Sequence, residues 1–355
     1  MIKNTVTCKG EIRITIWTGY TRGVNLGGWL SQCPHTRERY ETFIGEEDIH
    51  RIRDWGLDHI RVPVDYELVE DAQGARREEG FAYIQRAIDW SRDCGLNMIL
   101  DLHKTCGFSF DAGEHECGFF EDAALQERFY RLWEEFARRF GRYADTLSFE
   151  LLNEVTEQRY CAAWNRIAAA CIARIRAIAP TVKILVGGYW NNSIEALPDL
   201  LSPPDGNIVY TFHCYEPLIF THQGAYWIPG MDLDFRLSAD TSYGEMEACS
   251  RRELKHWHAS FDGLDPAGRL DAEYFAERFA EAVRVAGERG AGLYCGEYGV
   301  IDRAAPEDQL RWYACIHEAF ERCGIGRAAW SYRAMDFGLA DKRLDGVRER
   351  LLALL

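Results

Sequence analysis

The 355-residue chain is 47% hydrophobic and 27% charged, which argues against disorder and allows a large core in one barrel or in two domains. It carries 41 Lys and Arg against 56 Asp and Glu, and the resulting net charge of −15 disfavours nucleic acid and anionic membrane surfaces as partners. Eleven Trp and seventeen Tyr supply flat rings that suit sugars as well as cores.

The first twenty residues, MIKNTVTCKGEIRITIWTGY, are interrupted by charges and lack the apolar core of a signal peptide. No segment reaches the roughly eighteen apolar residues of a membrane span. We expect a cytoplasmic protein, or a secreted one if a signal peptide lies outside this sequence. The twelve cysteines form no C-x-x-C pair, so we interpret them as free thiols; pairing of Cys106 with Cys117, or a metal site there with His115, is the alternative.

Short β-rich segments alternate with longer helical patterns along the chain. The predicted strands are 22–28, 58–64, 97–103, 147–154, 183–190, 208–216, 291–299 and 326–334. Helical patterns lie between them, for example at 45–56, 121–141, 160–180, 271–290 and 306–324. Eight strands with intervening helices predict an α/β fold of the (β/α)₈ TIM barrel type. A doubly wound sheet is the alternative, but no phosphate-binding glycine motif follows any predicted strand.

The interval after the sixth predicted strand is too long for a simple connection. A structureless loop of that length is uncommon in a compact domain, so we predict a small helical insertion at 217–270, beside the top face of the barrel. The organisation predicted for 1–355 is one catalytic domain, with 1–20 as an N-terminal extension. An extra strand at the bottom of the barrel is one interpretation of that extension.

Polar side chains cluster at the ends of the predicted strands, where barrels of this kind carry their active sites. One such residue alone is more often a satisfied structural group, but so many at one rim favour a functional site. They are Arg61, His103, Asn153, Glu154, His213, Tyr215, Glu297 and Trp330.

Glu154 and Glu297 end the fourth and seventh predicted strands, on nearly opposite sides of the barrel. Glycoside hydrolysis needs two such carboxylates, one to protonate the departing oxygen and one to attack the sugar or activate water. The parts of competing chemistries are missing, because the chain has no G-x-S-x-G, no H-E-x-x-H and no Asp cluster for a divalent ion. We therefore predict a glycosidase that needs neither a metal nor an organic cofactor.

The ordered set of motifs RGVNLGGWL, HIRVPV, LDLH, FELLNEV, FHCYEP, YCGEYG and AAWSY resembles glycoside hydrolase family 5, also called cellulase family A. The likeness runs from about Arg22 to the C-terminus. HCYEPLIFTHQGAYW is similar to clostridial endoglucanases with a helical insertion after strand six. The resemblance implies a retaining enzyme that cuts β-1,4-glucosidic bonds in cellulose-type and mixed-linkage β-1,3-1,4-glucans by endo action. We expect it to act as a monomer on a β-glucan polysaccharide or oligosaccharide.

The resemblance also implies roles for individual residues. Glu154 is the expected general acid/base and Glu297 the expected nucleophile, with the carboxyl groups about 5 Å apart. Arg61 would keep Glu297 ionised, and the charge of Glu297 would raise the pKa of Glu154. Tyr215 would donate a hydrogen bond to Glu297, and Asn153 would bind the 2-hydroxyl of the reacting sugar.

The remaining implied roles concern positioning and sugar binding. His103 and His213 would position carboxylates and hydroxyls, and Trp330 would form the floor under the reacting sugar. Outer subsites are expected at Asn25, Trp190, Asn191, Asn192 and Trp227, each with a structural role as its alternative. The chain departs from its relatives at Lys104, where many carry a second His.

Two other functions remain open. An exo-β-1,3-glucanase or β-glucosidase is one, because RGVNLGGWL also occurs in that part of the family. A non-catalytic carbohydrate-binding barrel is the other. It is disfavoured because both glutamates, Arg61 and Tyr215 are present.

Overall fold

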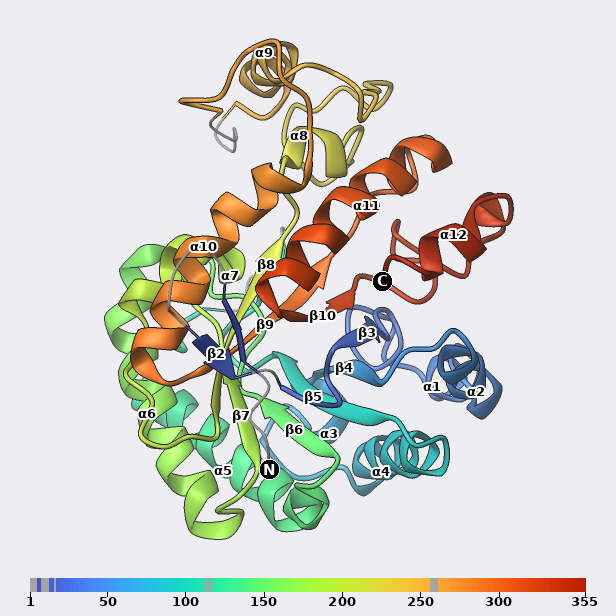
Figure 1. Ribbon diagram of the computed structural model, residues 1–355. Coiled ribbons are helices and arrows are strands. Elements are labelled where there is room, and N and C mark those ends of the chain that lie inside the picture. Colours follow the sequence, from blue (N-terminus) through green and yellow to red (C-terminus); the bar gives the residue numbers. More distant parts are fainter. Residues whose placement is uncertain (1–4, 8–12, 16, 112–113, 115–116, 256–260) are drawn as a thin grey trace.

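The computed structural model describes residues 5–7, 13–15, 17–111, 114, 117–255 and 261–355 (Figure 1). Eight parallel strands close into a barrel in the order β10-β3-β4-β5-β6-β7-β8-β9. The barrel strands are β3 Arg22–Asn25, β4 His59–Asp65, β5 Asn97–Lys104, β6 Leu147–Glu150, β7 Lys183–Val186, β8 Ile208–Cys214, β9 Gly292–Tyr298 and β10 Gly326–Ala329. The predicted (β/α)₈ barrel is thereby confirmed.

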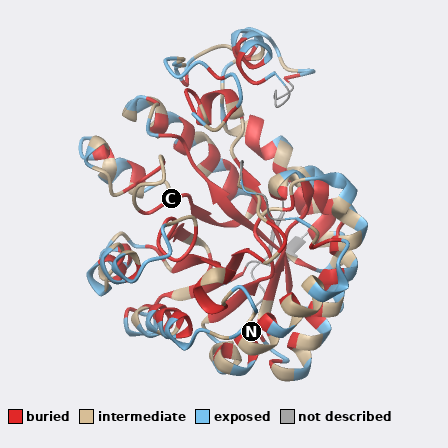
Figure 2. Ribbon diagram, turned by 180° about the vertical axis from the view of Figure 1, so that it is seen from behind, coloured by how far each residue is buried: buried red, intermediate tan, exposed pale blue. Residues whose placement is uncertain are grey.

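Helices surround the barrel and turn their apolar faces toward it, as the buried faces in Figure 2 show, apart from α8 and α9, which lie in the segment after β8. Those of at least nine residues are α2 Glu46–Asp54, α4 Glu78–Asp93, α5 Ala123–Phe140, α6 Cys161–Ile178, α9 Tyr243–Glu253, α10 Ala272–Arg289 and α11 Pro306–Cys323. Shorter ones are α1 Arg37–Thr42, α3 Tyr66–Val69, α8 Leu218–Thr221 and α12 Arg348–Leu352. The segment labelled α7, Tyr189–Asn192, is a turn rather than a regular helix, because its backbone is left-handed at Trp190 and Asn191. Strands such as β4 are buried at every residue, because helices cover the outside and side chains fill the inside.

Local sequence signals mark the start and the end of α10 and α11, the helices that precede the last two barrel strands. The Asp271 side chain accepts a hydrogen bond from the Tyr274 backbone at the start of α10, and α11 begins at Pro306. Both helices end at a glycine in the left-handed conformation, Gly290 at φ 66° and Gly324 at φ 65°. Left-handed backbone suits glycine because it has no Cβ, so each helix stops there, and two residues separate it from the strand that follows.

Four barrel strands, β3, β6, β7 and β10, end at least three residues before their predicted ends. β6 ends at Glu150 and β7 at Val186, because the pairing between them extends only from Ser148 to Glu150 on the β6 side. Asn153 and Glu154 therefore lie on the loop just above the barrel rim. The residues that follow β7 form a tight turn above the same rim.

The bottom of the barrel is closed by residues from the N-terminal segment. β1 Thr5–Thr7 and β2 Arg13–Thr15 form an antiparallel pair, and β2 lies against β9 and α10. Trp17 and Tyr20 stack at 3.9 Å between ring centroids, in a cluster with barrel side chains such as Ile99 and Tyr294. The Tyr20 hydroxyl donates to the Thr146 carbonyl at 3.0 Å. Aromatic rings thus seal the end of the barrel opposite the polar strand ends.

The segment between β8 and α10 contains α8 and α9, joined by irregular chain, and extends beyond the barrel at the top of Figure 1. It is tied to the barrel where the Ile301 backbone donates to the Thr221 carbonyl at 2.9 Å. The division into one domain with an insertion and an N-terminal extension stays a prediction. Among the described residues, no helix is both long and apolar enough to cross a membrane.

Candidate active site

Arg61 is the centre of the polar cluster inside the top of the barrel. It lies on β4 and is fully buried. Its guanidinium donates to Glu150 at 2.7 and 3.1 Å and to Glu297 at 2.8 Å, and it pairs with Asp101 at 3.0 Å. Burial alone would lower the pKa of Arg61, but the charges of Asp101, Glu150 and Glu297 raise it well above the ordinary value. One fixed cation therefore holds three carboxyl groups, each from a different strand.

Each of the two carboxylate oxygens of Glu297 accepts one hydrogen bond. Arg61 donates to Oε1 at 2.8 Å, and the Tyr215 hydroxyl donates to Oε2 at 2.9 Å, as the resemblance implies. Burial, followed by the charge of Glu297, raises the pKa of Tyr215 well above its usual value, so Tyr215 remains a donor. Only 7% of the Glu297 side chain is exposed. The carboxylate is oriented from both sides.

Glu154 faces this group from the loop after β6. Its Oε1 lies 2.7 Å from His213 Nδ1, and its Oε2 accepts a hydrogen bond from the Asn191 amide at 2.7 Å. One carboxylate oxygen of Glu154 and one of Glu297 lie within 4.8 Å of each other, and a His213 nitrogen lies within that distance of both. The structure therefore brings the two predicted glutamates together across a small gap.

Burial shifts the pKa values of Glu154 and His213 in opposite directions. Burial raises the pKa of Glu154 to about 7, against the effect of the Asn191 hydrogen bond. Burial lowers the pKa of His213 to about 4, so its imidazole is neutral at neutral pH. The sequence-based expectation attributed the rise at Glu154 to the charge of Glu297. Burial is the larger cause, because the carboxyl sits above a packed barrel with 12% of its side chain exposed.

His103 and Trp330 form a flat apolar surface next to the pair. Their rings stack with an angle of 4° and a centroid distance of 5.8 Å, and Phe110 meets His103 edge-on. His103 Nδ1 lies 2.5 Å from Asp101 Oδ2, and burial lowers the pKa of His103. This contact fixes the orientation of the ring. His103 is therefore held by Asp101 rather than by either of the two facing glutamates.

Asn153 lies at the same rim and has an unused donor. Its Oδ1 accepts from Arg61 at 2.7 Å, while its Nδ2 is buried and has no hydrogen-bond partner among the described residues. A buried amide donor without a partner is costly unless a ligand satisfies it. This donor is available to a hydroxyl group of a bound molecule.

Two of the predicted outer-subsite residues, Asn25 and Asn192, are fully buried, and their subsite roles stay predictions. The Asn25 side chain is fully buried, donating to the Gly296 and Ala328 carbonyls at 2.9 and 3.1 Å and accepting from Arg61. Asn192 is also fully buried, with its amide 3.3 Å from His213 Nε2. The Asn25 amide is paired on both sides inside the barrel, whereas Asn192 Oδ1 has no hydrogen-bond partner among the described residues. Asn191 contacts Glu154 directly and so does more than line a subsite.

The two predicted stacking platforms differ in exposure. Trp190 is 51% exposed, on the turn next to Asn191. Trp227, after α8, is half-buried against His222 and Phe337, and Tyr215 contacts those same two rings. Tyr226, its neighbour, is 67% exposed. Flat aromatic surfaces thus flank the carboxyl pair on the β7 and β8 sides.

Sequence reasoning missed two charged residues of the site, Asp101 and Glu150, which both pair with Arg61. Both lie inside otherwise apolar strand segments, LDL and SFEL. A charged residue in a core strand must be paired, so this pattern was the available signal.

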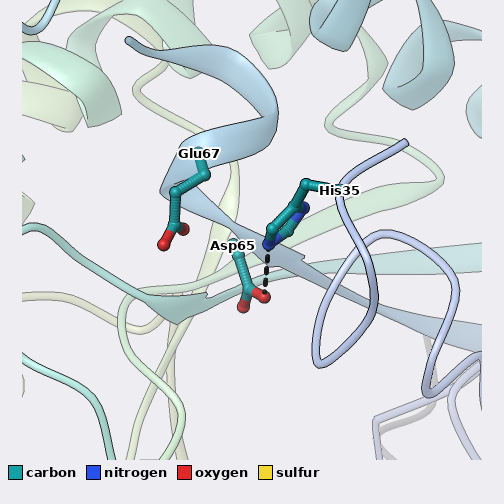
Figure 3. A group of neighbouring side chains, drawn as sticks. All are labelled: His35, Asp65 and Glu67. Atoms are coloured by element: carbon teal, nitrogen blue, oxygen red, sulfur yellow. Dashed lines mark ion pairs between the residues drawn. The ribbon is translucent and has the colours of Figure 1, made fainter. Parts of the chain in front are cut away.

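A second titratable cluster lies beside the site, where the loop before α1, the end of β4 and α3 meet (Figure 3). His35 Nε2 pairs with Asp65 at 3.4 Å, and ligand atoms of His35, Asp65 and Glu67 lie within 4.8 Å of one another. Burial acts to raise the pKa of Asp65, but the His35 hydrogen bond and the charge of Lys104 lower it overall. Asp65 also accepts from Ser31 at 2.7 Å. Because the positive charge of Lys104 already acts on Asp65, we assign no metal to this cluster. We interpret it as a polar wall of the rim.

Comparison with known proteins adds independent support. A model of cellulases, glycosyl hydrolase family 5, matches residues 21–336. The chain is 45% identical over 309 residues to cellodextrinase A of Ruminococcus flavefaciens, a match that covers 87% of this chain and 84% of that protein. It is 33% identical over 341 residues to endoglucanase C of Acetivibrio thermocellus, covering 95% and 98%.

Among solved structures, the clostridial cellulose synthase subunit Z of Clostridioides difficile aligns with a TM-score of 0.72 and 26% identity, covering 95% of this chain and 99% of that one. The sequence match, the barrel and the facing carboxyl pair agree with one another. The chain therefore belongs to glycosyl hydrolase family 5, the cellulase family.

Proposed function

We propose that this glycoside hydrolase cleaves β-1,4-glucosidic bonds within cellulose-type and mixed-linkage β-1,3-1,4-glucans, with retention of anomeric configuration. The observation that carries the proposal is the carboxyl pair, whose nearest oxygens lie within 4.8 Å. Retaining glycosidases hold their carboxyl groups about 5 to 5.5 Å apart, whereas inverting enzymes leave about 6.5 to 9.5 Å for a water. The names of the relatives, a cellodextrinase and an endoglucanase, support a β-glucan as substrate.

The environments of the two glutamates support a division of roles. Glu297 accepts hydrogen bonds from Arg61 and Tyr215, which favour the ionised form that a nucleophile needs. Glu154 has a pKa of about 7 and so keeps its proton in mildly acidic solution, as a general acid must. We therefore assign Glu297 as the nucleophile and Glu154 as the acid/base.

The reaction then has two steps. Glu154 gives its proton to the glycosidic oxygen as the bond from C1 to that oxygen breaks, and a Glu297 oxygen bonds to C1. The charge of Glu297 is lost in the resulting ester. Glu154, now ionised, takes a proton from a water whose oxygen attacks C1, and Glu297 leaves as a carboxylate.

The surrounding residues support sugar binding in the reacting position. The free Asn153 donor suits the 2-hydroxyl, a contact that strengthens in the transition state. The ring of Trp330, stacked beside His103, suits the apolar face of a glucose unit. Trp190 and Trp227 would stack on neighbouring units of the chain.

Chemical rescue tests the assigned roles. We expect Glu297→Ala and Glu154→Ala each to lose at least about a hundredfold in kcat on barley β-glucan. With azide and dinitrophenyl cellobioside, Glu154→Ala should yield the β-configured glycosyl azide, because azide attacks the covalent intermediate. Glu297→Ala should yield the α-configured azide by direct attack. Glu38→Gln, an exposed carboxyl, is the control. Wild-type turnover by Glu297→Ala would exclude the nucleophile assignment.

Product profiles separate the proposed activity from exo action. Endo cleavage lowers the viscosity of β-glucan quickly and releases a mixture of oligosaccharides. An exo-β-1,3-glucanase or β-glucosidase releases glucose alone from the first minutes, with laminarin as the better substrate in the first case. A non-catalytic binding barrel would bind these glucans and release nothing.

A further inference from the structure

The turn that follows β7 has an unusual backbone. Trp190, Asn191 and Asn192 have φ values of 51°, 57° and 58°, so three consecutive residues are left-handed. This conformation is rare for residues other than glycine, and Asn tolerates it better than Trp does. Such backbone persists only where its surroundings hold it, and it is concentrated at functional sites.

Several contacts hold the turn in place. The Asn191 backbone donates to the Val155 carbonyl at 3.0 Å, which ties the turn to the residue after Glu154. The Ser193 backbone donates to the Tyr189 carbonyl at 3.2 Å and closes the turn. A Cβ on Gly187 would lie 2.1 Å from the Asn192 side chain, so only glycine leaves room for that amide. The turn is therefore fixed at both ends and from below.

The turn delivers one amide to each side of the acid/base carboxyl. Asn191 Nδ2 donates to Glu154 Oε2 at 2.7 Å. Asn192 Nδ2 lies 3.3 Å from His213 Nε2, and His213 Nδ1 lies 2.7 Å from Glu154 Oε1. A neutral imidazole has one donor and one acceptor nitrogen. With Asn192 donating to Nε2, the hydrogen of His213 is on Nδ1 and points at Glu154.

Other groups around Glu154 bring charge or come from other strands. His103, His213 and Tyr215 face it from β5, β8 and the loop after β8. Charged neighbours are Arg61, Asp101, Asp111 and Glu297. Asn191 donates directly to Glu154 without adding charge, as the neutral His213 does on the other oxygen.

We propose that the left-handed turn Trp190–Asn192 is the positioning element of the acid/base, in which Asn191 holds one oxygen of Glu154 and Asn192 sets the tautomer of the histidine on the other. The inference rests on the role of Glu154 given under the proposed function. Both oxygens of Glu154 then have a fixed donor in the ionised state. Glu154 can therefore serve first as acid and then as base without rotating.

Asn191→Gly tests the inference, because glycine keeps the left-handed backbone and removes only the amide. Loss of the donor should raise the proton affinity of Glu154, so the basic limb of kcat/KM on barley β-glucan should move up by about one pH unit. Activity should fall more on β-glucan than on dinitrophenyl cellobioside, whose leaving group needs no proton. Asn192→Asp, which can only accept, should reverse the tautomer of His213 and also move the basic limb upward.

Asn165→Ala is the matched control. Asn165 also braces this region, donating to the Asp199 carbonyl at 2.7 Å, but it does not contact Glu154. It should leave the basic limb in place, and circular dichroism should show that all variants are folded. An unmoved basic limb in Asn191→Gly, with Glu154→Ala inactive on β-glucan, would overturn the inference alone. Full activity of Glu154→Ala on β-glucan would instead overturn the proposed function.

Discussion

Arg61 shows how much of the site depends on one side chain. It is the cation shared by Asp101, Glu150 and Glu297, all of them buried. Buried carboxylates are tolerated only when they are paired, because the low dielectric around them does not stabilise an isolated charge. Strand β4 therefore supplies stability and orients Glu297, the proposed nucleophile, through the same guanidinium.

Removing this cation should affect folding and catalysis together. We expect Arg61→Met to lower the free energy of unfolding by about 3 to 5 kcal/mol, since it leaves buried carboxyl groups unpaired. Arg61→Lys should restore part of the stability but little of the activity, because an ammonium cannot reproduce the planar fork. Urea unfolding and kcat measure the two effects. Arg37→Met, at an exposed ion pair with Glu41, is the control and should leave stability nearly unchanged.

Gly27 determines how closely the chain approaches Trp330. A Cβ at this position would lie 2.7 Å from the far edge of the Trp330 ring. We expect Gly27→Ala to push the ring toward the sugar position and to raise KM for cello-oligosaccharides severalfold, with a loss of stability of about 1 to 3 kcal/mol from overpacking. Gly45→Ala, where a Cβ meets nothing within 4 Å, is the matched control. An unchanged KM in Gly27→Ala would show that the ring does not bound the sugar site.

The position of residues at strand ends predicted that Glu154, His213 and Glu297 lie together, because the carboxyl ends of parallel strands must meet at one rim. The position of a residue at a strand end does not predict how deeply its side chain is buried. Asn25 and Asn192 lie in the same sequence positions relative to their strands as sugar-binding residues would, yet both are fully buried. Whether an amide faces the groove or the barrel interior depends on how neighbouring strands pair. A single sequence does not contain that information.

At the scale of elements, the same residue type has opposite functions at the two ends of the barrel. Trp17 is buried in the bottom cluster, whereas Trp190 is half exposed beside the carboxyl pair. We expect Trp17→Ala to lower the free energy of unfolding by about 3 to 5 kcal/mol with KM unchanged. Trp190→Ala should change stability by no more than about 0.5 kcal/mol but raise KM for longer oligosaccharides. Urea unfolding and kinetics on cello-oligosaccharides of increasing length would show whether the two effects separate in this way.

The strands themselves were predictable because both faces of a barrel strand are buried, which leaves apolar runs between helical patterns. Their ends were less so. The predicted strands 147–154 and 183–190 continue past the last paired residues, Glu150 and Val186. Apolar residues such as Leu151 and Leu152 remain buried above the barrel, so hydrophobicity does not mark the end of hydrogen bonding. The left-handed turn at Trp190 carried no sequence signal beyond its two asparagines.

At the scale of the whole molecule, a net charge of −15 surrounds a site made for a neutral polymer. Long-range attraction of substrate is therefore absent, and binding must come from stacking and hydrogen bonds. The acidic groups instead make the stability of the protein depend on pH. The buried carboxyl groups are the ones whose titration differs most between the folded and unfolded chain.

Glu154 provides a test of that coupling. Its pKa in the folded protein is about 7, above the ordinary 4.5, so the folded state holds the proton more tightly than the unfolded state does. The stability that this proton contributes is complete below about pH 4.5 and is lost as the pH rises through about 7. Glu154→Gln, a neutral mimic of the protonated acid, should match the wild type near pH 4.5 and be more stable by up to about 3 kcal/mol at pH 8.

Urea unfolding of both proteins at the two pH values measures this difference, with Glu38→Gln as the exposed control. The kcat/KM of the wild type on β-glucan should fall as the pH rises above about 7, because the ionised Glu154 has no proton to give. The stability would then be lost between about pH 4.5 and 7 and the activity above about pH 7, and both changes report the raised pKa of Glu154. A stability difference that stays constant between pH 4.5 and pH 8 would mean that Glu154 does not hold its proton in the folded protein, and the acid would have to be sought elsewhere at the rim.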